Sequence, residues 1–293
     1  MTTKRLLACA LAALVGGVLV AKADYFSYNL HGRLEDSVTR FNKQAANLLP
    51  IPRGYLAGCT MSVSSSTVLQ ITGCYSVDST NVVVMNQTST FTKSTGGAWT
   101  AGTGNNGMGT GLTVSNSTWY HVFQILNGGL VDYYLDTSVT AANAPAGTTA
   151  FRRIGSVKTG ASTAPLTAFS QQGDEFLWAT AVAEINGSTG NVAALANLTG
   201  IPPGIENIGK FRYIASGTSS SAGVIYSTDA IVGTVASPAG NTNIFFPANS
   251  QVDGEVWVRT SAGSPSQIGF NFNVSATLQL VTYGWLDTRG RNN

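Results

Sequence analysis

Charged residues are scarce in this sequence. It holds 16 basic and 14 acidic residues among 293, which is 10% against about 25% in an ordinary globular domain. The formal net charge is only +2 and the basic residues are not clustered, which argues against a nucleic-acid-binding protein. Two histidines and three cysteines exclude a multi-metal enzyme, although a single carboxylate Ca²⁺ site stays open. We expect no cofactor.

Catalytic motifs are also missing. There is no G-x-S-x-G elbow and no Walker loop, and the glycine-rich run Gly102–Gly111 lacks the Lys and the strand-to-helix context of a phosphate site. His31 and His121 are far apart, so no triad can be assembled from spacing, and His121 is expected to be an ordinary strand histidine. Asp174 and Glu175 are adjacent and point apart on a strand, unlike the facing carboxylates of a glycosidase. We predict a non-enzymatic protein, with a depolymerising enzyme as a weaker alternative class.

The abundant residues predict a β-rich body. Hydrophobic residues make up 43% and aromatic residues 9% of the chain, which is enough for a buried core. After Pro52, short alternating or β-branched runs are separated by Gly, Ser, Thr, Asn and Pro, with turn signals such as Asn127-Gly128-Gly129. The pattern predicts an all-β fold, an antiparallel β-sandwich or jelly-roll-like body made of one or two sandwiches.

A segment near residues 158–165 (KTGASTAP) divides this body into a first β region, 53–158, and a second, 159–293. Whether each region forms its own sandwich, or both contribute strands to one, is open. The glycine-rich stretch Ser94–Leu112 is too polar for a core, so it is either an exposed connection or a surface feature with a role in recognition.

Residues 1–23 form a hydrophobic leader. Lys4 and Arg5 precede the uncharged run Leu6–Ala21, and a small-x-small sequence ends just before Asp24. These three parts are typical of a secretory signal peptide, and the run of 16 residues is shorter than the roughly 20 that span a bilayer. Cleavage of the leader and its retention as an anchor helix both remain open.

The next segment, 24–52, has apolar residues at spacings of four, three, four and three. These candidate oligomerisation residues are Leu34, Val38, Phe41, Ala45 and Leu48. The spacing predicts a short N-terminal helix, but two heptads are too few for an autonomous coiled coil. The helix therefore either packs on a neighbouring domain or forms an oligomerising stalk, for which a homotrimer is the preferred state.

Cys59 and Cys74 are the only cysteines after the leader, 15 residues apart across a predicted hairpin. They are a possible disulfide pair. Two buried free thiols are the alternative, because the sequence does not show whether the Cα atoms come within bonding range.

Several charged residues of the body are expected to form structural ion pairs. Arg152 and Arg153 are neighbours on a predicted strand, so their side chains should point to opposite faces, and the inward one must be paired. The carboxylates expected to be available to it are Asp132, Asp136, Asp174 and Glu175. Asp287 and Arg289 are expected to pair across a closing turn, with Trp285 in the core. Binding of an acidic sugar by the two neighbouring arginines is the alternative.

Four blocks of the sequence carry a resemblance. They are WYHVFQILNGGLVDYYLDTSVTAANAPAGTTAFRRIGS at 119–156, FSQQGDEFLW at 169–178, VWVRT at 256–260 and GWLDTRG at 284–290. Taken in this order they resemble a widespread family of bacteriophage and prophage virion proteins, usually described as tail fibre or phage structural proteins. The resemblance covers roughly residues 54–291. It implies a β-rich, oligomeric particle component that contacts the host surface, and it brings no catalytic residues. The hydrophobic leader departs from the family pattern.

The sequence therefore predicts a bacteriophage virion structural protein, a tail fibre or fibre-base subunit that takes part in attachment to the host. Its expected partners are copies of itself, other virion proteins and a host surface receptor, with polysaccharide as one candidate and nucleic acid excluded. A secreted bacterial adhesin or lectin-like module is the alternative. This alternative interprets the leader as a secretory signal peptide, and the Trp, Tyr and Asn content suits sugar binding.

Overall fold

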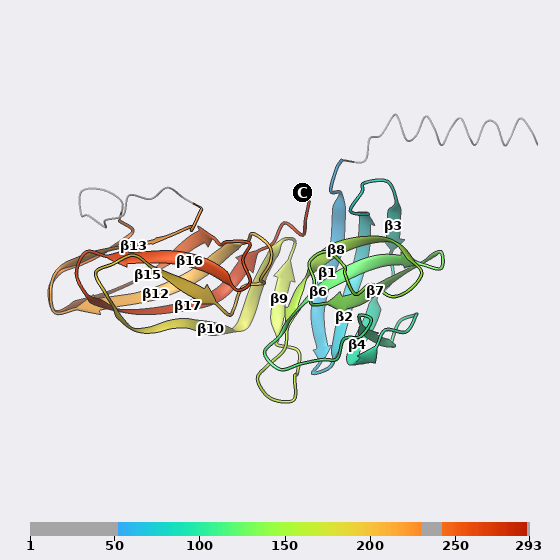
Figure 1. Ribbon diagram of the computed structural model, residues 1–293, viewed down its shortest axis with the longest axis horizontal. Helices are drawn as coiled ribbons and strands as arrows, with labels where there is room; N and C mark the ends of the chain where they lie inside the picture. The colour runs from blue at the N-terminus through green and yellow to red at the C-terminus, as the bar shows by residue number, and fades with distance from the viewer. Residues whose placement is uncertain (1–51, 230–241, 292–293) are drawn as a thin grey trace, which may run out of the picture. The chain divides into compact units, whose positions relative to one another are not determined.

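The computed structural model describes residues 52–229 and 242–291 (Figure 1). Every regular element in these ranges is a β-strand, and most strand pairs are antiparallel, so the all-β prediction is confirmed. Residues Arg53–Asn293 form one compact unit. The leader 1–23, the predicted N-terminal helix and its seam residues Leu34, Val38, Phe41, Ala45 and Leu48 lie outside the described residues.

The first eight strands build one sheet. They are β1 (Leu56–Ser65), β2 (Val68–Val77), β3 (Val84–Gln87), β4 (Phe91–Ala98), β5 (Asn106–Met108), β6 (Trp119–Asn127), β7 (Leu130–Asp136) and β8 (Thr148–Lys158). Their order is β1-β2-β4-β5-β7-β6-β8, with β3 paired to β2 off this path. The pairs made by β5 are parallel and the others antiparallel. The β6–β7 hairpin turns at Gly128 and Gly129, whose positive φ angles of 57° and 80° suit the Asn-Gly-Gly signal.

Strands β6 and β7 are buried on both faces. Val122, Tyr133 and Leu135 belong to the large core, whereas Phe123 and Tyr134 belong to a smaller cluster. Because neighbouring residues point to opposite faces, a strand covered on both sides reads as a nearly continuous apolar run. This explains the sequence WYHVFQIL.

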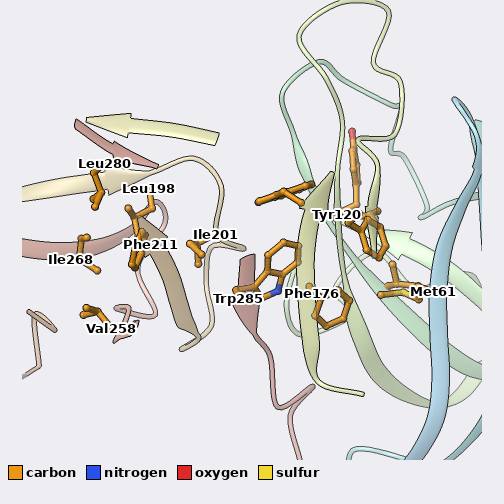
Figure 2. Close-up of a cluster of buried hydrophobic side chains, with 14 of the residues drawn as sticks. Met61, Tyr120, Phe176, Leu198, Ile201, Phe211, Val258, Ile268, Leu280 and Trp285 are labelled. Atoms are coloured by element: carbon orange, nitrogen blue, oxygen red, sulfur yellow. The ribbon is translucent and has the colours of Figure 1, made fainter. Parts of the chain in front are cut away.

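The remaining strands build two further sheets. They are β9 (Phe169–Gln172), β10 (Glu175–Thr189), β11 (Ala194–Leu198), β12 (Ile208–Gly217), β13 (Ser221–Tyr226), β14 (Ile244–Phe246), β15 (Ser250–Arg259), β16 (Ser266–Phe272) and β17 (Ala276–Leu286). One sheet has the order β15-β12-β17-β10-β9 and the other β11-β16-β13-β14. Phe211 and Leu280 of the first sheet share a buried cluster with Ile268 of the second (Figure 2), so the two sheets face each other across apolar side chains.

The change from one sheet system to the next falls between Lys158 and Phe169, in the stretch where the sequence places the boundary between β regions. One core nevertheless runs through both regions. Trp119 of β6 packs edge-on against Trp285 of β17, with ring centroids 5.6 Å apart. Phe176 of β10 stacks on Trp285 with ring centroids 5.0 Å apart (Figure 2). The expectation that Trp285 fills the core is confirmed, since its side chain is fully buried.

Candidate functional site

A buried ion pair joins β8 to the C-terminal turn. Arg153 Nη1 donates to Asp287 Oδ2 at 2.8 Å and Nη2 donates to Oδ1 at 2.5 Å, with side chains only 9% and 1% exposed. The backbone N–H of Arg289 also donates to Asp287 Oδ1. Burial raises the pKa of Asp287, but the charge of Arg153 and these hydrogen bonds outweigh it and hold that pKa below its ordinary value. The Asp287 carboxylate is therefore ionised at neutral pH.

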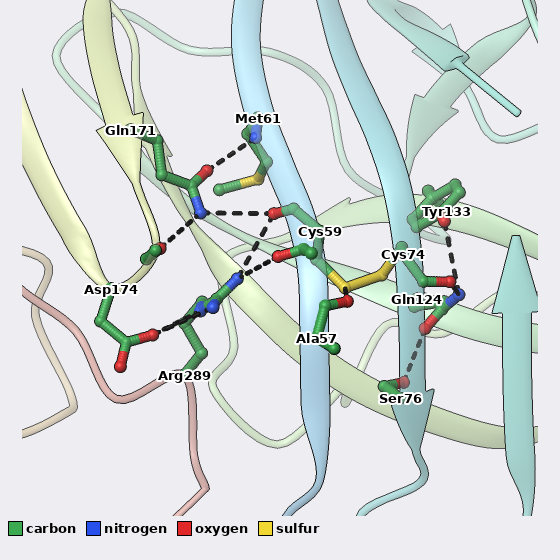
Figure 3. Close-up of a disulfide and its surroundings, with 12 residues drawn as sticks. Ala57, Cys59, Met61, Cys74, Ser76, Gln124, Tyr133, Gln171, Asp174 and Arg289 are labelled. Carbon is green, nitrogen blue, oxygen red and sulfur yellow. Dashed lines mark hydrogen bonds and ion pairs between the residues drawn. A yellow bond between two sulfur atoms is a disulfide. The ribbon is translucent and has the colours of Figure 1, made fainter. Parts of the chain in front are cut away.

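Arg289 extends this network to β1. Its Nε donates to Asp174 Oδ1 at 3.0 Å, and Nη1 donates to the carbonyl oxygen of Gly58 at 2.9 Å and more weakly to that of Cys59 (Figure 3). Burial lowers the pKa of Arg289 to about 10. Arg291 forms a second ion pair with Asp174. The C-terminal turn is thus fastened to two other parts of the fold.

These contacts correct the predicted pairings. Arg153 pairs with Asp287, which the sequence assigned to Arg289, and Arg289 pairs instead with Asp174. Positions 153 and 287 are 134 residues apart, and spacing along the chain carries no information about such a contact. Glu175 pairs with Lys210 of β12, a residue that the sequence analysis did not select.

Arg152 and Asp136 take no part in the ion pairs found among residues 52–229 and 242–291. Arg152 Nη2 donates to the carbonyl oxygen of Gly54, away from the partner of Arg153, as strand alternation predicts. The Asp136 carboxylate accepts hydrogen bonds from the backbone N–H of Ser138 and from the backbone N–H and the side-chain amide of Asn143. It therefore holds the loop after β7 and does not neutralise an arginine.

Cys59 and Cys74 are joined by a disulfide between β1 and β2 (Figure 3), with their Cα atoms 4.0 Å apart. Both residues are buried. Gln171 of β9 forms hydrogen bonds with the β1 backbone beside the disulfide. Its side chain accepts from the N–H of Met61 and donates to the carbonyl oxygen of Cys59. The disulfide itself is therefore shielded from solvent, and side-chain hydrogen bonds tie this part of β1 to β9.

His121 is buried in β6, where Nδ1 lies 2.9 Å from Ser156 Oγ. Burial and the nearby Arg153 charge lower the pKa of His121 to about 4, so the ring is neutral at pH 7. In the part of the chain that the structure describes, no three His, Cys, Asp or Glu side chains are grouped to hold a metal ion. Among residues 52–229 and 242–291, no helix is long and apolar enough to cross a membrane.

Asp132 pairs with Lys93, and this pair organises the glycine-rich stretch that the sequence analysis singled out. Lys93 Nζ lies 2.8 Å from Asp132 Oδ1, and it also donates to the carbonyl oxygens of Thr100 and Gly102. Asp132 Oδ2 accepts from the N–H of Gly102 at 2.7 Å. Sequence reasoning missed Lys93, although its position two residues after the buried Phe91 on one strand indicates an inward side chain.

A hollow of about 450 Å³ lies beside this pair, between the glycine-rich loop and the β6–β7 hairpin. The residues that line it are Asn86, Gln87, Phe91, Trp99, Ala101, Gly102, Asn127, Gly129, Leu130, Val131 and Asp132. The lining combines two aromatic rings, three side-chain amides and one carboxylate. Such a mixture of an apolar wall with few polar groups is typical of small-molecule sites.

Two other surfaces are weaker candidates for a binding site than this hollow. A larger hollow of about 710 Å³ is lined in part by Arg153, Asp174 and Arg259, all of which already have ionic partners. On the outer face of the five-stranded sheet, Trp257 is 55% exposed. Lys210 Nζ lies 4.2 Å from its ring centroid, and this ring lines neither the 450 Å³ nor the 710 Å³ hollow.

Comparisons with known proteins do not place the chain in a family. No family model matches the sequence, and no curated protein does. Among solved structures, the chain is similar to the crystal structure of a Bacillus thuringiensis Cry1Da tryptic core variant, with 6% sequence identity and a TM-score of 0.19. The likeness covers 80% of this chain and 52% of that one, so the chain spans about half the length of that protein. A likeness this weak carries no argument about fold or activity.

Proposed function

We propose that this protein is a non-enzymatic bacteriophage virion component, a tail fibre or fibre-base subunit that takes part in attachment to the host surface. The observation that supports the proposal best is that three of the four blocks of the resemblance meet in the core. Trp119, Trp178 and Trp285 come from three different blocks, and their ring centroids lie 5.0 to 5.6 Å apart. The Arg153–Asp287 pair joins two of the same blocks. Residues of these blocks thus pack together between the two β regions, which suits a scaffold protein.

Within this proposal the second β region is a sandwich of two sheets and the body as a whole is jelly-roll-like. The low charge of the chain suits broad contacts between subunits, where charged residues are depleted. The protein assembles with copies of itself through the segment 24–52, a trimer being the preferred state, and with other virion proteins. Its site of action is the phage tail or fibre, where it meets a host receptor.

The first experiment is mass spectrometry of phage particles released by the producing culture, together with light scattering of the purified full chain. We expect the chain among the particle proteins and a mass of three copies in solution. Val38→Ser with Phe41→Ser, in the predicted seam, should shift that mass toward one copy, whereas Val82→Ser on the exposed β2–β3 connection should not. Absence from particles, or a stable monomer with segment 24–52 intact, would refute the proposal.

A secreted adhesin or lectin-like module is the second candidate, and the disulfide favours it. Disulfides form and persist in oxidising compartments, and the leader is typical of exported proteins. Intact-mass measurement of the native protein separates the two candidates. A chain that begins at Asp24 with the disulfide formed supports export, and a chain that begins at Met1 with all three cysteines, Cys9 included, as free thiols supports assembly in the cytoplasm.

A further inference from the structure

The hollow beside the glycine-rich loop has the chemistry of a sugar site. Asn127 of the β6–β7 hairpin and the β3 residues Asn86 and Gln87 line the hollow. Asn86 and Gln87 are neighbours on one strand, so one of their two amide side chains faces the hollow. Asn127 Nδ2 donates to the carbonyl oxygen of Ala146 at 2.9 Å, which orients the amide and leaves its oxygen to accept a hydroxyl group. Amides both donate and accept, as vicinal hydroxyl groups do.

Trp99 supplies an apolar wall held in a fixed position. Its Nε1 donates to the carbonyl oxygen of Tyr133 at 3.1 Å, and Lys93 Nζ lies 5.2 Å from its ring centroid. Since the indole N–H already has a partner, the part of this half-buried ring that lines the hollow offers only apolar carbon surface. Such a surface packs against the C–H face of a pyranose ring.

Charge decides which saccharides fit. Asp132 is the only charged residue that lines the hollow, and the fully buried Lys93 neutralises it. The Asp132 carboxylate is held by Lys93, by the N–H of Gly102 and by the N–H of Tyr133. These three bonds leave one of its roughly four acceptor positions for a ligand hydroxyl group. An acidic sugar would meet no free cation there, so the site favours an uncharged ligand.

We propose that this hollow binds a neutral pyranose saccharide through Trp99, the amide of Asn127, one of the two β3 amides (Asn86 or Gln87), and the Asp132 carboxylate. The site rests on the proposed function in one respect, because it names the host-surface group that the attachment protein recognises. The hydrogen bonds from Lys93 to Thr100 and Gly102 preform the site, which lowers the entropy cost of ordering a loop on binding.

The test uses saturation-transfer NMR and calorimetry on the purified full chain. The probes are the methyl glycosides of glucose, galactose, mannose and N-acetylglucosamine, with methyl glucuronide as the acidic comparator. We expect transfer to at least one neutral glycoside and none to the glucuronide. The double variant Asn86→Ala, Gln87→Ala should weaken binding at least tenfold without unfolding the protein, because both side chains lie at least partly in solvent on a short strand.

Trp257→Ala is the matched control, since it removes an exposed indole from the other β region and should leave binding unchanged. Trp99→Phe keeps a ring at the wall and should retain most of the affinity, which separates a stacking role from a general loss of folding. No transfer to any neutral glycoside, preference for the glucuronide, or loss of binding in Trp257→Ala alone would overturn the inference.

The content of particles is measured separately and distinguishes the two proposals. A chain present in particles that binds none of the neutral glycosides refutes the saccharide site and leaves the virion function standing. A chain that binds them through the hollow but is absent from particles refutes the virion function and supports the site.

Discussion

Buried charges are the residue-scale feature that sets this protein apart from a simple apolar β scaffold. Arg153, Asp287, Lys93 and Asp132 are all buried, and each has its partner within hydrogen-bonding distance. A charge without a partner is very costly in a protein interior, so removing one member of a buried pair costs far more than removing both. These pairs therefore determine how the surrounding segments can pack.

We predict that Arg153→Met lowers the free energy of unfolding by about 3 to 5 kcal/mol, because Asp287 is left buried and unpaired. The double variant Arg153→Met, Asp287→Leu should recover most of this loss. Urea unfolding followed by tryptophan fluorescence measures both. Arg212→Gln is the control, because its pair with Glu255 is exposed and its loss should not shift the midpoint. A double variant as unstable as the single one would contradict the expected origin of the effect.

His121 predicts how stability changes with pH. The pKa of this ring is about 4 in the folded protein, against about 6.5 in an unfolded chain, so between these values the unfolded state binds the extra proton. Stability should therefore fall as the pH drops from 6.5 to 4, by about 3 kcal/mol from this group. The His121→Gln variant should lose that slope in urea midpoints measured from pH 7 to 4. An unchanged slope would show that other groups cause it.

At the scale of elements, local features follow from the sequence more readily than pairings do. The turn at Gly128-Gly129 and the strand β6 could be predicted because they depend on residues close together in the chain. The glycine-rich stretch Ser94–Leu112 was expected to be an exposed connection or a surface feature and too polar for a core, but Met108 within it is fully buried in β5, and its anchor, Lys93, was not selected. Lysine is rarely buried without a partner, and the burial of Lys93 is explained by its ion pair with Asp132 of β7.

The disulfide stabilises the β1–β2 hairpin. It closes a loop of about 15 residues, and a cross-link of that length contributes about 3 kcal/mol by restricting the unfolded chain. We predict that Cys59→Ala with Cys74→Ala lowers the unfolding free energy by about that amount. Adding reductant should lower the unfolding free energy of the parent chain and leave that of the double variant unchanged. The disulfide is checked by isolating the protein without reductant, denaturing it and titrating its free thiols. Reaction of both Cys59 and Cys74 as free thiols would contradict the disulfide.

At the scale of the whole molecule, the shared core makes the two β regions depend on each other. Trp285 contacts Trp119 of the first region and Phe176 and Trp178 of the second. A core that runs through both regions favours cooperative unfolding, which agrees with residues Arg53–Asn293 forming one compact unit.

We predict one calorimetric transition for the parent chain. Trp285→Ala should lower the free energy of unfolding by about 3 to 5 kcal/mol, because a fully buried ring is removed, and should separate the transitions of the two regions. Trp257→Ala, at an exposed position, should leave the thermogram unchanged. Two separate transitions already present in the parent chain would show that the regions unfold independently.

The sequence by itself determined the β class, the turn at Gly128-Gly129, the lack of familiar catalytic motifs and the opposite directions of Arg152 and Arg153. Those properties depend on composition and on a two-residue period, which act over a few residues. Only the tertiary structure decided which charges meet, that Cys59 lies beside Cys74, and that an amide-lined hollow forms under the glycine-rich loop. Alternation tells which face of a strand a side chain occupies, whereas the group that lies across from it depends on how distant segments pack.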